Sequence, residues 1–144
     1  MNKSIKIISV IFLLFSLVSC AGTGSKSLSS VSTYLDEGGS GKVFISRESN
    51  FYASAVLFTV TLNGQQIAKL GSGELVSDSS NVGTNNLKIS VEGFQGIGIK
   101  DASISYQGDS SKDNFFIISI KPNLFGAELK LIETTESTWK SESG

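Results

Sequence analysis

Apolar residues recur at every second position in several segments between residues 42 and 135, and that period constrains the fold more than any other feature of the sequence. Successive side chains of a β-strand point to opposite faces, whereas a helix repeats its apolar positions every three or four residues. The alternation is clearest in residues 56–62, 87–91 and 102–106. These segments are therefore predicted to be half-buried strands with one apolar face each.

The first of these segments runs directly into the dipeptide Asn63-Gly64. Asn and Gly tolerate the positive φ angles that a two-residue type I′ turn requires, so the dipeptide predicts a β-hairpin. The returning strand is expected at Gln65–Leu70, with Ile67 opposite Val60.

Further strands are predicted at Lys42–Arg47, 115–120 and 127–132, with a short one at 74–77. Segment 115–120 is apolar at consecutive positions, which is typical of a central strand that is covered on both faces. Pro122 is expected to end this strand, because proline cannot donate a hydrogen bond to a ladder.

We therefore expect an all-β fold, because clusters of Gly, Asn, Asp and Ser separate the strands and no helical pattern of useful length occurs in the domain. Residues 42–135 are predicted to form a single small antiparallel β-sandwich or barrel of about seven short strands. Residues 136–144 are expected to be a polar C-terminal tail, in which Trp139 has no predicted partner.

Residues 1–19 have the organisation of a secretory signal peptide. Lys3 and Lys6 give a positively charged start, and residues 7–18 are almost entirely apolar. A transmembrane helix needs about 20 apolar residues to cross roughly 30 Å of hydrocarbon, and this run is shorter. A helix buried in the domain is the other alternative, but the basic start and the abrupt polar continuation favour a cleaved signal.

The sequence Leu17-Val18-Ser19-Cys20 resembles the lipobox of bacterial lipoproteins, which ends in a small residue and a cysteine. The resemblance implies cleavage between Ser19 and Cys20, a thioether from Cys20 to diacylglycerol, and an N-acyl chain such as palmitate. The alternative for a lone cysteine is a buried apolar thiol, which the position of Cys20 at the end of the apolar run disfavours. Because Ala21 is not Asp, the family's sorting rule implies the inner leaflet of the outer membrane, with the protein facing the periplasm.

Residues 20–41 are rich in Ser and Gly and poor in apolar side chains. Such a segment buries too little surface to offset the entropy of ordering it, so we expect a flexible tether after the lipidated Cys20. A coil of this length spans roughly 25 Å root-mean-square. Val31, Tyr34 and Leu35 are exceptions that could dock on the domain or form a short extra element.

Composition argues against several classes of function. The chain has no histidine, and lipid would consume its single cysteine, so zinc, haem and thiolate chemistry lack their usual ligands. Without Lys3 and Lys6 the net charge is 10 − 13 = −3, which gives no electrostatic footprint for nucleic acid. We expect neither a metal nor a cofactor apart from the covalent lipid, and no enzyme activity, although a Ser–Lys dyad remains formally open.

Several short motifs resemble a group of small Gram-negative lipoproteins that carry a β-domain of unknown function. These motifs are Lys42-Val-Phe-Ile-Ser-Arg47, Asn63-Gly64, Gly73-Glu-Leu75, the run from Gly83 to Leu87, and residues 115–120 followed by Leu124-Phe-Gly-Ala-Glu-Leu129. The resemblance covers about residues 42–135 and implies a compact β-domain facing the periplasm. Relatives often have Pro-Gly-x-His where this chain has Val82-Gly-Thr-Asn85, so a role tied to that histidine is not carried over.

Four residues are candidates for binding. Arg47 is the only arginine, and its planar guanidinium suits a carboxylate or phosphate. The alternative for Arg47 is an ion pair with a loop Asp or Glu. Phe94, Leu124 and Phe125, together with Ile97, are apolar residues in predicted loops. They would form an exposed docking patch or, alternatively, plug the ends of the core.

Two polar loops invite comparison with ligand sites. Residues 109–114 offer carboxylate oxygens but lack the spacing of a calcium loop, so a polar hairpin loop is expected. Residues 93–98 are rich in glycine but lack the strand-to-helix transition of a phosphate loop.

These observations favour a membrane-anchored lipoprotein that acts as a non-enzymatic, periplasm-facing binding or interaction module. A structural or assembly accessory of a cell-envelope complex, with a protein partner, is the alternative. A hydrolase of wall or lipid material is the third hypothesis, and no particular residue pair marks it.

Overall fold

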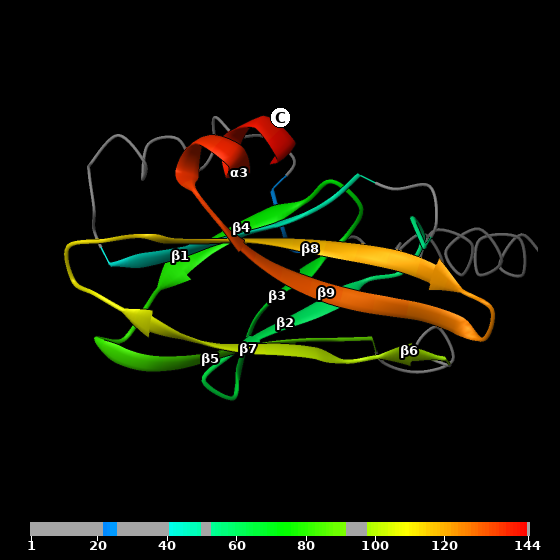
Figure 1. Ribbon diagram of the computed structural model, residues 1–144, viewed down its shortest axis with the longest axis horizontal. Coiled ribbons are helices and arrows are strands. Elements are labelled where there is room, and N and C mark those ends of the chain that lie inside the picture. The colour runs from blue at the N-terminus through cyan, green and yellow to red at the C-terminus, as the bar shows by residue number, and fades with distance from the viewer. Residues whose placement is uncertain (1–21, 26–40, 50–52, 92–97, 144) are drawn as a thin grey trace, which may run out of the picture.

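A computed structural model describes residues 22–25, 41–49, 53–91 and 98–143 (Figure 1). These residues form nine strands and one helix. The elements are β1 Lys42–Arg47, β2 Phe58–Leu62, β3 Gln65–Leu70, β4 Leu75–Ser79, β5 Gly83–Ser90, β6 Ile99–Lys100, β7 Ala102–Gly108, β8 Asn114–Asn123, β9 Gly126–Thr134 and α3 Glu136–Ser143.

The strands make two sheets that pack face to face, which confirms the all-β prediction and selects a sandwich over a closed barrel. One sheet has the order β4-β1-β8-β9-β6 and the other the order β3-β2-β5-β7. Most neighbouring strands are antiparallel, as expected, but β1 pairs with β8 in parallel and β6 pairs with β9 in parallel. The described residues therefore form a mixed sandwich with nine strands rather than about seven.

The β2–β3 hairpin forms at the predicted dipeptide. Asn63 has φ 51° and Gly64 has φ 83°, so both central residues take the positive angles of a type I′ turn. The predicted partner of Val60 is wrong by one residue, because Ala68 lies opposite Val60. A register shift next to Thr61 accounts for the difference and leaves Ala68, rather than Ile67, on the buried side.

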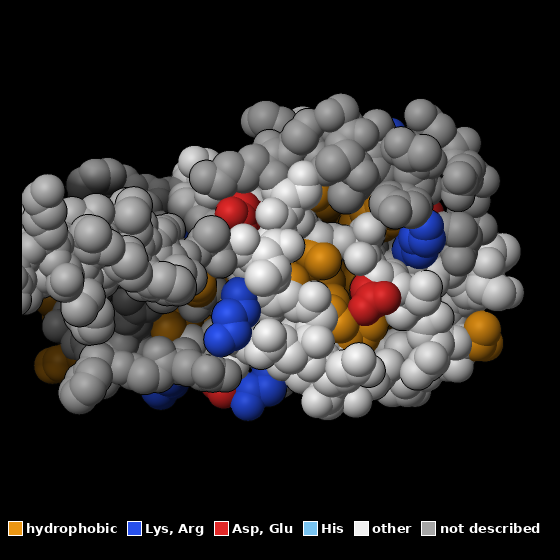
Figure 2. All heavy atoms as spheres, turned by 180° about the vertical axis from the view of Figure 1, so that it is seen from behind, with side chains coloured by type: hydrophobic (Ala, Val, Ile, Leu, Met, Phe, Trp, Pro, Cys, Tyr) orange, Lys and Arg blue, Asp and Glu red, His pale blue; other side chains and the backbone are white. Residues whose placement is uncertain are grey.

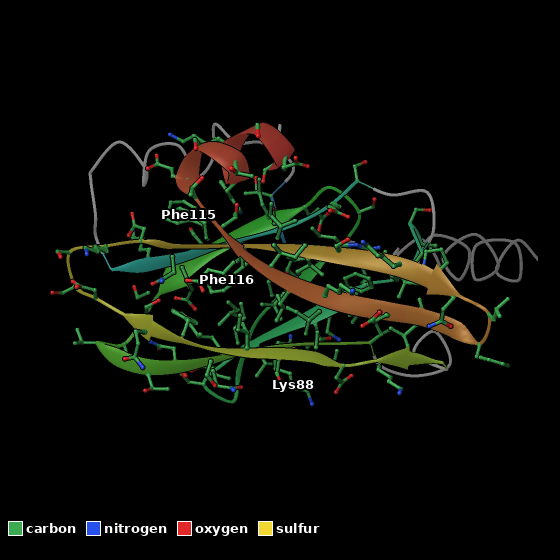
Figure 3. All side chains as sticks on the ribbon, viewed as in Figure 1. Lys88, Phe115 and Phe116 are labelled. Atoms are coloured by element: carbon green, nitrogen blue, oxygen red, sulfur yellow. The ribbon has the colours of Figure 1, made fainter. Side chains whose placement is uncertain are left out.

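The main core lies between the sheets and follows the predicted alternation. Val60, Leu87 and Ile89 from one sheet are fully buried and pack in the same cluster as Val43 and Phe116 from the other. Lys88 points away from this core in Figure 3 and forms a 2.7 Å ion pair with Asp101 at the surface. The alternation of apolar and polar residues therefore predicts which side chains of β5 are buried.

Strand β8 is covered on both faces, as its sequence predicts. Phe115 and Phe116 point to opposite sides of the strand, Phe115 toward α3 and Phe116 between the sheets (Figure 3). Pro122 does not end the strand, because β8 continues to Asn123 and pairs with β9 along its whole length. The proline lies beyond the level at which β1 ends, at Arg47 opposite Ile118. An edge position of this kind tolerates the missing N–H.

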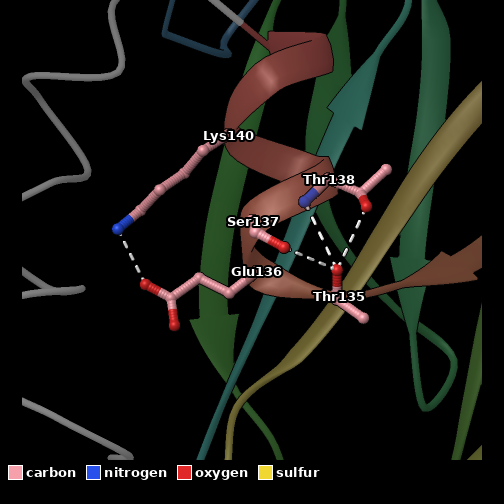
Figure 4. A network of polar contacts seen from close by, with 5 residues as sticks. All are labelled: Thr135, Glu136, Ser137, Thr138 and Lys140. Carbon is pink, nitrogen blue, oxygen red and sulfur yellow. Dashed lines mark hydrogen bonds and ion pairs between the residues drawn. The ribbon is translucent and has the colours of Figure 1, made fainter.

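The predicted polar tail is wrong, because residues Glu136–Ser143 form helix α3. Figure 4 shows how the helix begins: the Thr135 hydroxyl accepts a 3.3 Å hydrogen bond from the Thr138 amide, the geometry of an N-cap. Glu136 places a carboxylate in the first turn and forms a 2.7 Å ion pair with Lys140 one turn later. Capping and pairing both favour the helix locally.

Helix α3 is held on the outer face of β1 and β8 by Trp139. Its side chain is fully buried beside the stacked rings of Phe44 and Phe115, whose centroids are 5.1 Å apart. The indole N–H donates a 3.2 Å hydrogen bond to the carbonyl of Phe116. Trp139 thus has both an apolar site and a polar partner, which a buried indole requires.

Residues 22–25 fall in the predicted flexible tether, but for these four residues that prediction is wrong. The Thr23 amide donates a 2.7 Å hydrogen bond to the carbonyl of Lys69 on β3. Ser25 pairs with Leu75 on β4 through two bonds of 2.8 Å. The chain therefore crosses the edge of the sandwich from β3 to β4. Of the rest of the predicted tether only Gly41 is described, and its carbonyl accepts a 2.8 Å hydrogen bond from the Ser80 amide.

We predict that Trp139→Ala lowers the free energy of unfolding by about 3–5 kcal/mol, because it empties the apolar site beneath α3. Urea unfolding measures this change. Lys140→Ala is the matched control: it removes only an exposed pair and should cost about 0.5 kcal/mol. A loss of less than about 1 kcal/mol for Trp139→Ala would show that α3 is not part of the cooperative fold.

A second prediction concerns pH. Burial raises the pKa of Tyr106 above its usual value of 10.0, although the 2.7 Å hydrogen bond with Ser80 acts in the opposite direction. The contribution of this group to stability is therefore fully present below pH 10 and falls as the pH rises through the higher folded-state pKa. The stability advantage of the wild type over Tyr106→Phe should shrink above pH 10. A difference that stays constant with pH would contradict this assignment.

Candidate functional site

The most exposed apolar side chains of the described residues lie at one hairpin tip. Leu124 is 95% exposed and Phe125 is 92% exposed in the turn that joins β8 to β9. Contiguous exposed apolar side chains often mark sites of interaction with proteins or membranes. The core-plugging alternative is therefore wrong for these two residues, and the docking alternative stays a prediction.

The tip is fixed by its backbone. The amide of Phe125 donates a 2.9 Å hydrogen bond to Asn123 Oδ1, and the amide of Ala127 donates a 3.1 Å bond to the carbonyl of Gly98. Gly126 has φ 148°, and a Cβ atom there would lie 2.1 Å from the Gly98 oxygen. Glycine at position 126 thus allows the segment before β6 to pack directly against the tip.

A hollow of about 500 Å³ adjoins the tip, and its wall includes Phe125, Asn123 and residues Gly98 to Lys100. Charged side chains form a row across the outer surface beside it. Glu128 on β9 lies in register with Lys121 of β8 on one side and with Lys100 of β6 on the other. Lys130 forms a 3.7 Å ion pair with Glu128. Three lysines therefore surround one glutamate, which gives this surface a net charge of 3 − 1 = +2.

Arg47 is the one other predicted binding residue that the structure describes, and it does not lie at this tip. Phe94 and Ile97 lie outside the described residues, as do Ser19 and Cys20. Arg47 is in the interior of the sandwich. The sequence did not reveal the lysine row, since the parallel pairing of β6 with β9 that aligns Lys100 with Glu128 has no local signal.

Arg47 is a buried structural residue. It is 3% exposed, and its guanidinium lies 3.7 Å from the centre of the Phe58 ring. Nη1 donates to the carbonyls of Val56 and Leu70, and Nη2 donates to the carbonyl of Ala53. One side chain thereby ties the end of β1 to the end of β3 and to the loop before β2.

Burial lowers the pKa of Arg47 to about 10, while the charge of nearby Glu74 raises it in part. Both sequence alternatives assumed an accessible guanidinium, as a clamp or in an ion pair with a loop carboxylate. The clamp is wrong, because the terminal nitrogens donate to backbone carbonyls. Of the expected ion pair, only the electrostatic influence of the loop residue Glu74 is found among the described residues. Arg47 also borders a polar hollow of about 260 Å³, but Glu142 lines that hollow and disfavours an anion.

We predict that Arg47→Lys destabilises the protein by about 3 kcal/mol, because a single ammonium cannot satisfy three buried carbonyls that the guanidinium now reaches. The measurement is urea unfolding at neutral pH, where both side chains are charged. Lys121→Ala, an exposed change, is the control and should lie within about 0.5 kcal/mol of the wild type. Equal stability of Arg47→Lys and wild type would exclude the bonding described above.

The loop at residues 109–114 has its expected hairpin character. Asp109 Oδ1 accepts hydrogen bonds of 2.8 and 2.7 Å from the amide and hydroxyl of Ser111, which lower its pKa. No group of three or more potential metal-ligating side chains occurs among the described residues. On the face in Figure 2, lysine and acidic side chains are interspersed rather than gathered into a basic stripe.

Within the described part of the chain, no helix has the length and apolar character needed to cross a membrane. Comparison of the chain with protein-family models, with curated proteins and with solved structures gives no match.

Proposed function

We propose that this protein is a bacterial lipoprotein that acts as a non-enzymatic binding or interaction module of the cell envelope. In this proposal lipid on Cys20 holds the chain in the inner leaflet of the outer membrane, and the β-sandwich faces the periplasm. The β8–β9 hairpin tip is the interaction surface. Diacylglycerol and an N-acyl chain supply the anchor, since each buried CH₂ contributes roughly 0.8 kcal/mol and two or more chains hold firmly.

The exposure of Leu124 and Phe125 is the observation that carries the interaction role. The tip is preorganised, since hydrogen bonds to Asn123 and Gly98 fix its backbone before any partner binds. Binding then costs little ordering entropy, which favours recognition at this site. The lipobox-like sequence before Cys20 supports the anchor, and the absence of histidine supports a role other than catalysis.

A structural or assembly accessory of an envelope complex is the second candidate. Strand β7 supports it, because it spans seven residues and is one of the two outermost described strands of its sheet. An open edge of this kind can accept a strand from a protein partner. In-cell crosslinking from β7 would recover one stoichiometric partner if this candidate is right.

The anchor predicts a clear effect of Cys20→Ser. The variant should remain an uncleaved precursor without lipid, because the thiol that accepts diacylglycerol is gone. Metabolic labelling with palmitate, together with the mobility of the protein after globomycin treatment, measures this outcome. Lys26→Ser is a nearby control that should leave labelling unchanged. Palmitate incorporation into Cys20→Ser at the wild-type level would refute the anchor.

A further inference from the structure

We propose that the β8–β9 hairpin tip inserts Leu124 and Phe125 into the same bilayer that holds the lipid on Cys20. The tip would then be a second membrane contact that fixes the orientation of the domain. This inference rests on the proposed function, and it identifies the partner of the hairpin tip as a lipid bilayer.

The first argument is the position of the tip along the sandwich. Strand β8 runs parallel to β1, and Ile118 lies level with Arg47, where β1 ends. From Ile118 the chain continues through the last residues of β8 to Leu124 in the turn. At roughly 3.3 Å per residue, the tip lies about 20 Å beyond the end of β1. Among the coloured elements of Figure 1, the β8–β9 turn is an outermost point at the right.

The second argument is where the chain enters the domain. Gly22 packs beside Glu74 in the turn from β3 to β4, and the Arg47 amide bonds to the carbonyl of Glu74 at the same end of β1. Cys20 precedes Gly22 by two residues, so its Cα lies no more than about 7 Å from that of Gly22. A lipid on Cys20 would therefore be attached close to the β3–β4 turn, at the end of β1 beyond which the tip projects.

The third argument is the chemistry of the tip. Leu and Phe are side chains that partition readily into the boundary between headgroups and acyl chains. Behind them, the row of Lys100, Lys121 and Lys130 around Glu128 carries a net charge of +2. With the tip inserted, its two apolar side chains would meet the acyl chains, and the lysines behind them would meet the anionic headgroups.

The shape of the tip favours a bilayer over a protein partner. A stable protein interface buries about 1,000 Å² or more with complementary surfaces. The apolar part of this tip is two side chains on a projecting turn, and its flank is charged. A fluid lipid surface can accept such a point without a matching pocket.

A thiol-directed test uses the fact that Cys20 is the only cysteine and is consumed by lipid in the mature protein. Leu124→Cys therefore creates a single site for the environment-sensitive fluorophore NBD. Val82→Cys is the matched control, because Val82 is a 75% exposed apolar residue in the turn before β5, at the opposite end of the sandwich. Both positions are exposed, so neither label disturbs the core.

The labelled, lipidated full chains are inserted into vesicles of phosphatidylethanolamine with a minority of phosphatidylglycerol. We expect both proteins to float with the vesicles. NBD at position 124 should shift to shorter emission wavelengths, lose emission to nitroxide-labelled lipids and resist iodide. NBD at position 82 should keep its aqueous emission and remain open to iodide. Adding Phe125→Asp to the position 124 chain should reduce the quenching by nitroxide lipids.

The outcomes separate the two proposals. Flotation with equal iodide access at positions 124 and 82 leaves the anchor in place and overturns membrane contact by the tip. Protection from iodide without quenching by nitroxide lipids also overturns it, because a second copy or another protein would then cover the tip. Failure of the lipidated chain to float overturns the anchor, and the membrane contact with it.

Discussion

Burial of strand β8 on both faces is the constraint on which the rest of the structure depends. Phe116 and Ile118 face the core between the sheets, whereas Phe115 and Ile117 face the cluster beneath α3. A strand with only one buried face would leave the second set in water, at a cost of roughly 1.5–3 kcal/mol per large side chain. Helix α3 is therefore needed to cover the second face of β8, and Trp139 is the buried residue of the helix that covers it.

The same strand explains why the two ends of the sandwich differ. Strand β1 stops level with Ile118, where Arg47 turns inward and binds three carbonyls, while β8 and β9 continue as a two-stranded hairpin that β6 joins. At this end the chain arrives from residues 22–25, and the apolar tip projects. The Asn63-Gly64 turn lies at the other end and is polar. In the proposed anchored protein, the end with the apolar tip would face the membrane and the end with the Asn63-Gly64 turn would face water.

Local features of the fold could be predicted from the sequence, and long-range features could not. Alternation located the strands, and Asn63-Gly64 located a turn, because both depend on neighbouring residues. The parallel pairing of β1 with β8 joins segments some 70 residues apart, and nothing local encodes it. Trp139 was missed because its helix is mostly polar, although Thr135 and Glu136 are a recognisable start signal. The sequence did not decide whether Leu124 and Phe125 fill the end of the core or project into solvent. That choice depends on where strands from other parts of the chain end.

Hydrogen exchange on the lipidated chain tests the central claim most directly, namely that a doubly buried β8 holds an exposed tip against the membrane. The account predicts that the amides of residues 116–120 exchange slowest, at the rate of global unfolding. It also predicts that residues 123–127 gain protection when the protein moves from solution to vesicles, while the turn at residues 80–83 does not change. Rapid exchange in β8, or an unchanged tip on vesicles, would contradict it.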